Sequence, residues 1–121
     1  QETCYVRARA YAVSDFHHGP FAMINDNMPV FFYLCDKATD KDVLEMVTKV
    51  KNAGGDAIVF SNKQEYCDSG NVGIKLPDDA EGPAAIFAGA VAAQMFACRL
   101  AAVKGLNPDA PRGLTKVTVT K

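Results

Sequence analysis

Two short, uninterrupted runs of apolar residues stand out along the chain. Residues 29 to 35 read PVFFYLC, and residues 57 to 61 read AIVFS. Runs of this length, without alternating polar positions, are typical of strands that are buried on both faces of a parallel sheet. A third segment, VGIKL at 72 to 76, is also predicted to be a strand. We therefore expect three neighbouring strands.

Between the first two runs, the apolar positions follow a helical spacing. Asp40 stands where a helix N-cap is expected, and the adjacent Gly54 and Gly55 stand where a left-handed residue commonly ends a helix. The apolar side chains recur three and four residues apart, at Val43, Leu44, Met46, Val47 and Val50. A strand, helix, strand unit follows, which should cross over with the right hand.

A second helix is predicted over residues 82 to 105, a stretch rich in alanine that ends at Gly105. Its apolar part is about as long as the roughly 20 residues that a membrane span needs. Gln94 and Arg99 interrupt it, and Lys104 follows it, which favours a buried helix of a protein that does not enter a membrane. The segment after it is expected to be extended because it contains Pro108, Pro111 and Gly113.

The predicted elements indicate an α/β fold with helices on both sides of a parallel sheet. Three strands make a thin sheet, so further strands would be needed to complete a doubly wound domain. The chain also begins at Gln1 instead of a methionine. We expect an incomplete domain that belongs to a longer protein.

Composition narrows the classes of function. The chain has 121 residues, 49% of them hydrophobic and 22% charged, and a net charge of −1, which suits a soluble domain and argues against a nucleic-acid binder. No two cysteines have the spacing of metal ligands or redox dithiols, and no leader precedes them, so we expect free thiols, a cytoplasmic location and no metal or cofactor. The cysteines are Cys4, Cys35, Cys67 and Cys98.

Possible chemistry begins with an imidazole beside a turn. His18 directly precedes Gly19 and Pro20, a pair that fixes backbone geometry. A histidine at a turn, taken alone, is more often a surface or capping residue than a catalyst. The neighbouring His17 is interpreted as a surface residue.

Three segments give that histidine a context. The first reads ETCYVRARAY, then SDFHHGPFAMI and MPV; the second is the helix with Gln94 that ends AAVKGLNPD; the third is PRGLTKVTVTK. Together they resemble, in order and spacing, the sugar isomerase (SIS) domain of the glutamine:fructose-6-phosphate aminotransferases. The resemblance implies that residues 1 to 121 are the C-terminal part of one SIS domain of flavodoxin-like fold, including the family's closing tail.

The resemblance also implies roles for three residues. Glu2 falls on the glutamate that moves a proton between the first two sugar carbons, and His18 falls on the histidine thought to open the sugar ring in a neighbouring subunit. Lys116 falls on the tail lysine that forms a Schiff base with the open-chain ketose or contacts its oxygens. The implied partners are a sugar phosphate, a second copy of the protein and the remainder of the parent chain. The segment alone is expected to be inactive.

Other features leave the reaction open. Arg7, Arg9 and Asp15 differ from the residues common in the aminotransferases, and so does the KVTVTK ending. These differences favour relatives that deglycate or deaminate amino-sugar phosphates, and a sugar-phosphate sensor without catalysis is a further alternative. We find no glutaminase half and no Ser/Thr-rich phosphate loop, and we interpret Ser61–Lys63 and Ser69–Gly70 as ordinary loops.

Overall fold

The computed structural model describes residues 1 to 113, and Lys116 lies outside them. The described chain divides into two compact units. Unit 1 contains Gln1–Arg9 and the chain from Val91 onward, and unit 2 contains Ala10–Ala90. Each unit is described by itself.

Unit 2 is built on a parallel sheet of three strands in the order β1-β2-β3. The strands are β1 (Pro29–Leu34), β2 (Asp56–Ser61) and β3 (Val72–Lys75). Phe32 of β1 lies opposite Val59 of β2, which lies opposite Gly73 of β3. This sheet confirms the predicted α/β class with three neighbouring parallel strands.

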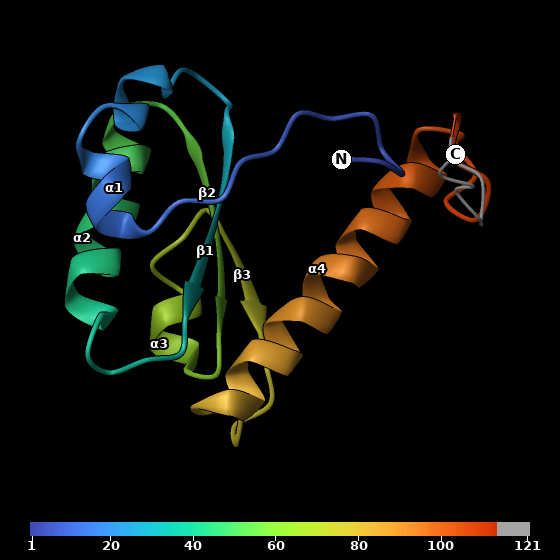
Figure 1. Cartoon of the computed structure of the whole chain (residues 1–121). Helices are drawn as coiled ribbons and strands as arrows, with labels where there is room; N and C mark the ends of the chain where they lie inside the picture. The colour runs from blue at the N-terminus through green and yellow to red at the C-terminus, as the bar shows by residue number, and fades with distance from the viewer. Residues whose placement is uncertain (114–121) are drawn as a thin grey trace, which may run out of the picture. The chain divides into compact units, whose positions relative to one another are not determined.

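Within the described residues, two helices are long and the others are short. Helix α1 (Val13–His17) and the 3-10 helix η1 (Pro20–Met23) precede the sheet, and α2 (Asp40–Asn52) joins β1 to β2. Helix α3 (Gln64–Cys67) joins β2 to β3, and α4 (Pro83–Val103) follows β3. In Figure 1, α1, α2 and α3 lie on one side of the sheet.

The core of unit 2 lies between α2 and one face of the sheet. Met46 and Val50 of α2 are 0% exposed, as is Val59 of β2. The helix presents these residues because they recur at helical spacing, and each buried side chain of this size contributes about 1.5–3 kcal/mol relative to an exposed one. The cluster also contains Phe32, Leu34, Val43, Val47 and Ala57.

Helix α2 ends as its glycines predict. Gly54 has a φ of 86°, its N–H donates to the carbonyl of Lys51 at 3.1 Å, and the N–H of Gly55 donates to the carbonyl of Val50 at 3.0 Å. This pair of bonds is the Schellman arrangement, which a left-handed glycine permits. The start of the helix was predicted wrongly: Thr39 is the N-cap, and Asp40 is the first helical residue.

The prediction that β1 is buried on both faces was wrong. Phe32 and Leu34 are buried, but Tyr33 is 46% exposed and Phe31 is 38% exposed. Alternate residues of a strand point to opposite faces, and only the face toward α2 is fully covered in unit 2. On the other face Tyr33 stacks on Phe60 with ring centroids 4.9 Å apart.

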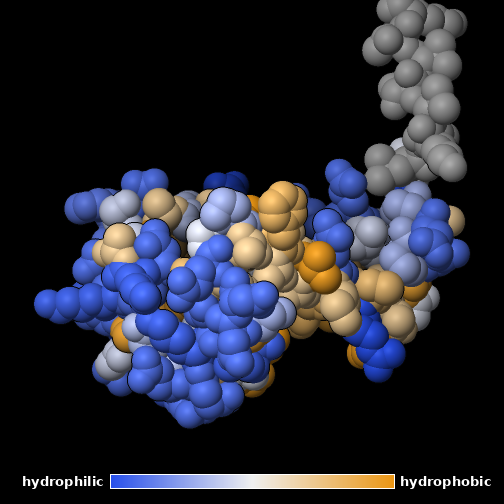
Figure 2. Space-filling view, turned by 90° about the horizontal axis from the view of Figure 1, so that it is seen from below, coloured by the Kyte–Doolittle hydropathy of each residue, from blue (hydrophilic) through white to orange (hydrophobic). Residues whose placement is uncertain are grey.

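Helix α4 was predicted to be buried, and this too was wrong. Its large side chains are exposed: Ile86 is 73% exposed, Phe87 74% and Met95 65%. Figure 2 shows hydrophobic residues gathered along this helix. Within residues 1 to 113, α4 is long and apolar enough to cross a membrane by length and composition alone, and 11% of its apolar window is buried. The absence of membrane contact stays a prediction.

The end of α4 follows its sequence. Gly105 has a φ of 68°, and the N–H of Leu106 donates to the carbonyl of Ala101 at 2.8 Å. Gly105 closes the helix as predicted, in the same arrangement as Gly54.

Candidate functional site

Glu2 lies in a turn at the start of unit 1, with its side chain exposed. The turn is closed by the N–H of Tyr5, which donates to the carbonyl of Gln1 at 2.8 Å. It is attached to α4 by Cys4, which is 4% exposed and whose thiol donates to the carbonyl of Ala97 at 3.1 Å. A small apolar side chain thus anchors the turn and leaves the carboxylate in solvent.

Tyr5 ends this turn in an unusual backbone conformation. Its φ is 53°, in the left-handed region that large side chains rarely adopt. Its hydroxyl accepts a hydrogen bond from the N–H of Arg112 at 2.7 Å, and the Arg112 guanidinium lies 4.2 Å from the ring centroid. The backbone N–H of Arg112, and then its side chain, lower the pKa of the Tyr5 phenol because both favour the phenolate.

His18 lies in unit 2 at the C-terminal end of α1, and its side chain is exposed. The N–H of His18 donates to the carbonyl of Asp15 at 3.2 Å, and Gly19 follows with a φ of 147°. On either side, Phe16 and Phe21 pack edge to face with centroids 6.2 Å apart. These rings also pack against the core, so they fix the turn while the imidazole points outward.

The three predicted site residues fall in different parts of the chain. Glu2 belongs to unit 1, His18 belongs to unit 2, and Lys116 lies outside the described residues. Arg7, Arg9 and Asp15, which depart from the family pattern, are all exposed. The roles of Glu2, His18 and Lys116 remain predictions.

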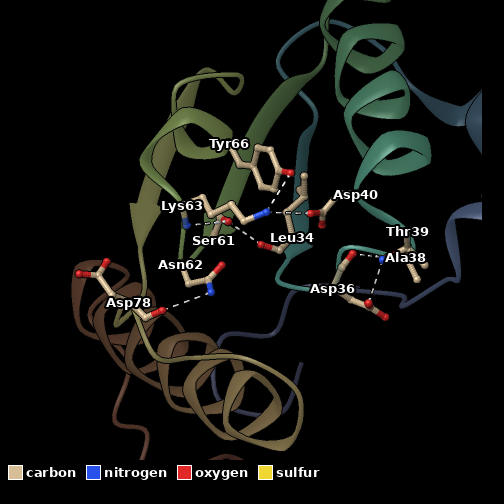
Figure 3. A network of polar contacts seen from close by, with 10 residues as sticks. All are labelled: Leu34, Asp36, Ala38, Thr39, Asp40, Ser61, Asn62, Lys63, Tyr66 and Asp78. Carbon is tan, nitrogen blue, oxygen red and sulfur yellow. Dashed lines mark hydrogen bonds and ion pairs between the residues drawn. The ribbon is translucent and has the colours of Figure 1, made fainter.

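A polar network that the sequence analysis read as an ordinary loop lies where β1 and β2 end (Figure 3). The hydroxyl of Ser61 donates to the carbonyl of Leu34 at 2.5 Å and accepts from the N–H of Lys63 at 3.1 Å. The Lys63 ammonium donates to the Asp40 carboxylate at 3.3 Å and to the hydroxyl of Tyr66 at 3.1 Å. The hydrogen bond to Tyr66 and, to a smaller extent, the one to Asp40 raise the pKa of Lys63.

This network explains why Asp40 does not cap α2. Its carboxylate is turned toward Lys63, and Asp36 makes the local turn instead, accepting from the N–H of Ala38 at 3.0 Å. One Asp40 oxygen and the amide oxygen of Asn62 are buried without a partner. Lys63 is already engaged by Asp40 and Tyr66, which sets it apart from an open phosphate cradle.

The signal that could have found this network is its position. The residues of the network come from the two stretches of chain that follow β1 and β2. In open α/β sheets, polar groups gather outside the carboxyl ends of the strands. Nearby, burial raises the pKa of the Cys35 thiol. Within residues 1 to 113, no group of three or more His, Cys, Asp or Glu side chains could hold a metal ion.

Curated relatives match nearly the whole chain. It is 33% identical over 121 residues to the glutamine--fructose-6-phosphate aminotransferase (isomerizing) of Pyrobaculum aerophilum, covering 99% of this chain. The proteins of that name from Halobacterium salinarum and Escherichia coli K12 are each 34% identical, covering 98% of the chain. No model of a protein family matches.

The match is confined to part of each relative, because the chain spans 20% of the length of all three. A parallel three-stranded sheet with flanking helices is consistent with an incomplete SIS-like domain. Over nearly its whole length, the chain is thus similar to a segment of the glutamine--fructose-6-phosphate aminotransferases (isomerizing).

Proposed function

We propose that this chain supplies the proton-transfer part of a sugar-phosphate isomerase, interconverting ketose and aldose phosphates of the fructose 6-phosphate and glucosamine 6-phosphate type. The observation that carries the proposal is the match, over nearly the whole chain, to relatives named as isomerizing aminotransferases. We assign the whole protein to the cytoplasm, which agrees with the free state of all four cysteines.

Glu2 is the proposed base. Its carboxylate takes the proton from the carbon beside the ketose carbonyl, and the electron pair of that C–H bond forms the double bond of an enediol. In this step the carbonyl oxygen takes up a proton from solvent. The carboxylic acid, whose proton exchanges with solvent, then protonates the neighbouring carbon, and the other hydroxyl of the enediol gives its proton back to solvent, which yields the aldose. One exposed carboxylate on an anchored turn suits this step because a single base can serve two adjacent carbons.

His18 is the proposed group for ring opening, and it acts in a neighbouring subunit. An imidazole can take the proton from the ring hydroxyl and give one to the ring oxygen near neutral pH. The exposed position of His18, on a turn fixed by packed aromatic rings, is compatible with contact to a second copy. This role makes the protein a homo-oligomer.

Lys116 is the proposed amine that engages the open-chain ketose. It condenses with the carbonyl to a Schiff base with loss of water, or it contacts the sugar oxygens. The phosphate and any nitrogen donor are bound by parts of the parent protein beyond this segment.

The test is turnover of fructose 6-phosphate by the full-length protein that carries this segment. Glu2→Gln should lower turnover by about 10²- to 10⁴-fold because general acid–base catalysis contributes that much, while substrate binding stays nearly intact. The matched control is Glu81→Gln, which changes another exposed glutamate in the same way. Unchanged turnover in Glu2→Gln would refute the role of Glu2. Tight sugar-phosphate binding with no turnover in the unaltered protein would favour the sensor.

A further inference from the structure

The sheet of unit 2 ends in two edge strands that differ in character. Strand β3 has four residues and contains Gly73 and Lys75, whereas β1 has six residues, PVFFYL, and no charged side chain. Proteins blunt the exposed edges of their sheets with short strands and with charged side chains, especially lysine. Pro29 stands at the first position of β1, where a proline is tolerated in interior strands as well. Strand β3 therefore has the features of a true edge, and β1 lacks them.

The backbone of β1 shows which groups lie at its outer side. The N–H of Asp56 in β2 donates to the carbonyl of Met28 at 2.9 Å, and the carbonyl of Leu34 accepts the hydroxyl of Ser61. Main-chain groups of successive strand residues point alternately to the two sides, so the even-numbered residues of β1 face β2. The N–H and the carbonyl of Tyr33 therefore point away from β2, toward the outer side of the sheet.

The side chain of Tyr33 belongs to an apolar surface. It is 46% exposed although its ring stacks on Phe60. Helix α4 passes close to this ring, because a Cβ atom added at Gly89 would lie 3.2 Å from it. In the turn of α4 before Gly89, Ile86 is 73% exposed and Phe87 is 74% exposed. Parallel sheets occur almost only with both faces covered, so a surface of this kind belongs inside a larger structure.

The relatives are long enough to supply what covers this surface. The chain spans 20% of their length, so a parent protein of similar size has about four fifths of its residues outside this segment. A parallel strand needs a crossover of about a dozen residues or more, usually a helix, and this length provides both. The two described pairings of the sheet are parallel. A second copy related by a two-fold axis would instead place its own β1 antiparallel to this one.

We propose that β1 is an interior strand of the parent protein. An apolar strand from the remainder of that protein pairs in parallel with the outer side of β1, and the segment attached to it covers the surface of Tyr33, Ile86 and Phe87. Strand β3 remains an edge of the complete sheet. This inference concerns the assembly of the domain, and it does not depend on the catalytic roles in the proposed function.

Amide hydrogen exchange in the full-length protein tests the pairing, with single residues resolved by mass spectrometry after electron-transfer fragmentation. Phe32 and Tyr33 are a matched pair, because their N–H groups point to opposite sides of β1. Lys75 is the reference for an edge: the N–H of Leu76 donates to the carbonyl of Ser61 at 2.8 Å, so the N–H of Lys75 points away from β2. Tyr33 should exchange within about tenfold of Phe32 and at least about a hundredfold more slowly than Lys75.

Two exchange results would overturn the inference. If Tyr33 exchanges at least about a hundredfold faster than Phe32, the outer side of β1 is open in the full-length protein. If Lys75 exchanges as slowly as Tyr33, the difference between the two edges is wrong.

Photocrosslinking identifies what covers the surface. The full-length protein carries p-benzoylphenylalanine in place of Phe87, whose exposed side chain leaves room for the added ring. After irradiation, the crosslinked product should run as one chain on a denaturing gel, and its crosslinked peptide should come from outside residues 1 to 121. A product of two chains would identify a second copy as the occupant and overturn the inference. Crosslinks confined to residues 1 to 121 would do so as well.

These measurements and the catalytic test fail independently. If Glu2→Gln keeps full activity while Tyr33 is protected from exchange, the proposed function is wrong and the inference about β1 stands. If Glu2→Gln is inactive while Tyr33 exchanges as fast as Lys75, the reverse holds.

Discussion

The contacts that stabilise unit 1 internally differ in kind from those that stabilise unit 2. Unit 2 has a continuous apolar core, in which Met46, Val50 and Val59 are 0% exposed. Among the described residues of unit 1, the buried hydrophobic side chains are those of Cys4 and Ala101. Distant segments of this unit are joined by single contacts such as Cys4 to Ala97 and Tyr5 to Arg112. Apolar burial therefore fixes the sheet, whereas a few directional contacts place the segment that carries Glu2.

The largest loss of stability is expected when a core side chain is removed from unit 2. Met46→Ala should lower the free energy of unfolding by about 2–5 kcal/mol because it leaves a cavity between α2 and the sheet. The measurement is urea denaturation. Met23→Ala makes the same change at a residue that is 50% exposed and should cost less than about 0.5 kcal/mol. Equal losses would contradict the assigned core.

A smaller effect is expected where a strand passes close to a helix. A Cβ atom added at Gly73 of β3 would lie 2.6 Å from the Cβ and 2.7 Å from the carbonyl oxygen of Cys67. Gly73→Ala should therefore cost about 1–3 kcal/mol through overpacking, as measured by thermal or urea unfolding.

Gly105 provides the comparison for Gly73. It has a φ of 68° but no atom within 4 Å of an added Cβ, so Gly105→Ala carries only the conformational cost of about 1 kcal/mol. Asparagine tolerates the left-handed region, so Gly105→Asn should be milder than Gly105→Ala, whereas Gly73→Asn should be worse than Gly73→Ala. The opposite order would show that crowding at Gly73 is not the cause.

The smallest effect is expected in unit 1. Cys4→Ala removes the thiol bond to Ala97 and should cost about 1 kcal/mol, the usual contribution of one hydrogen bond. Hydrogen exchange should show faster exchange in the Glu2 turn, with the amides of β2 unaffected. Cys98→Ala, at an exposed cysteine, serves as the control. Faster exchange in β2 as well would mean that the two units do not open separately.

Sequence reasoning succeeded where burial alone decides structure. The expected strands agreed with the observed ones to within one residue at every end. Gly54 and Gly105 marked the helix ends because a left-handed residue is needed there. It failed for the exposure of α4 and of Tyr33 in β1, because an apolar run does not say which of its faces the rest of the chain covers.

The contacts around the proposed site could not be predicted from the sequence, and the reason is a different one. Tyr5 and Arg112 are 107 residues apart, and Asp40 and Lys63 are 23 apart, so no local spacing predicts either pair. Asp40 had the residue type of a helix cap, but an ammonium ion brought close by the fold offered its carboxylate a better partner. The positions of Glu2 and His18 came from a resemblance in sequence, which locates residues without giving their geometry.

The central claim is that Glu2 carries the proton between neighbouring sugar carbons, and solvent exchange tests it most directly. The full-length protein is incubated with fructose 6-phosphate in D₂O, and deuterium in the sugar is followed by NMR. The unaltered protein should incorporate deuterium at the carbons of the transfer, Glu2→Asp should do so more slowly, and Glu2→Gln should show none above the uncatalysed reaction. Incorporation by Glu2→Gln at the rate of the unaltered protein would contradict the account.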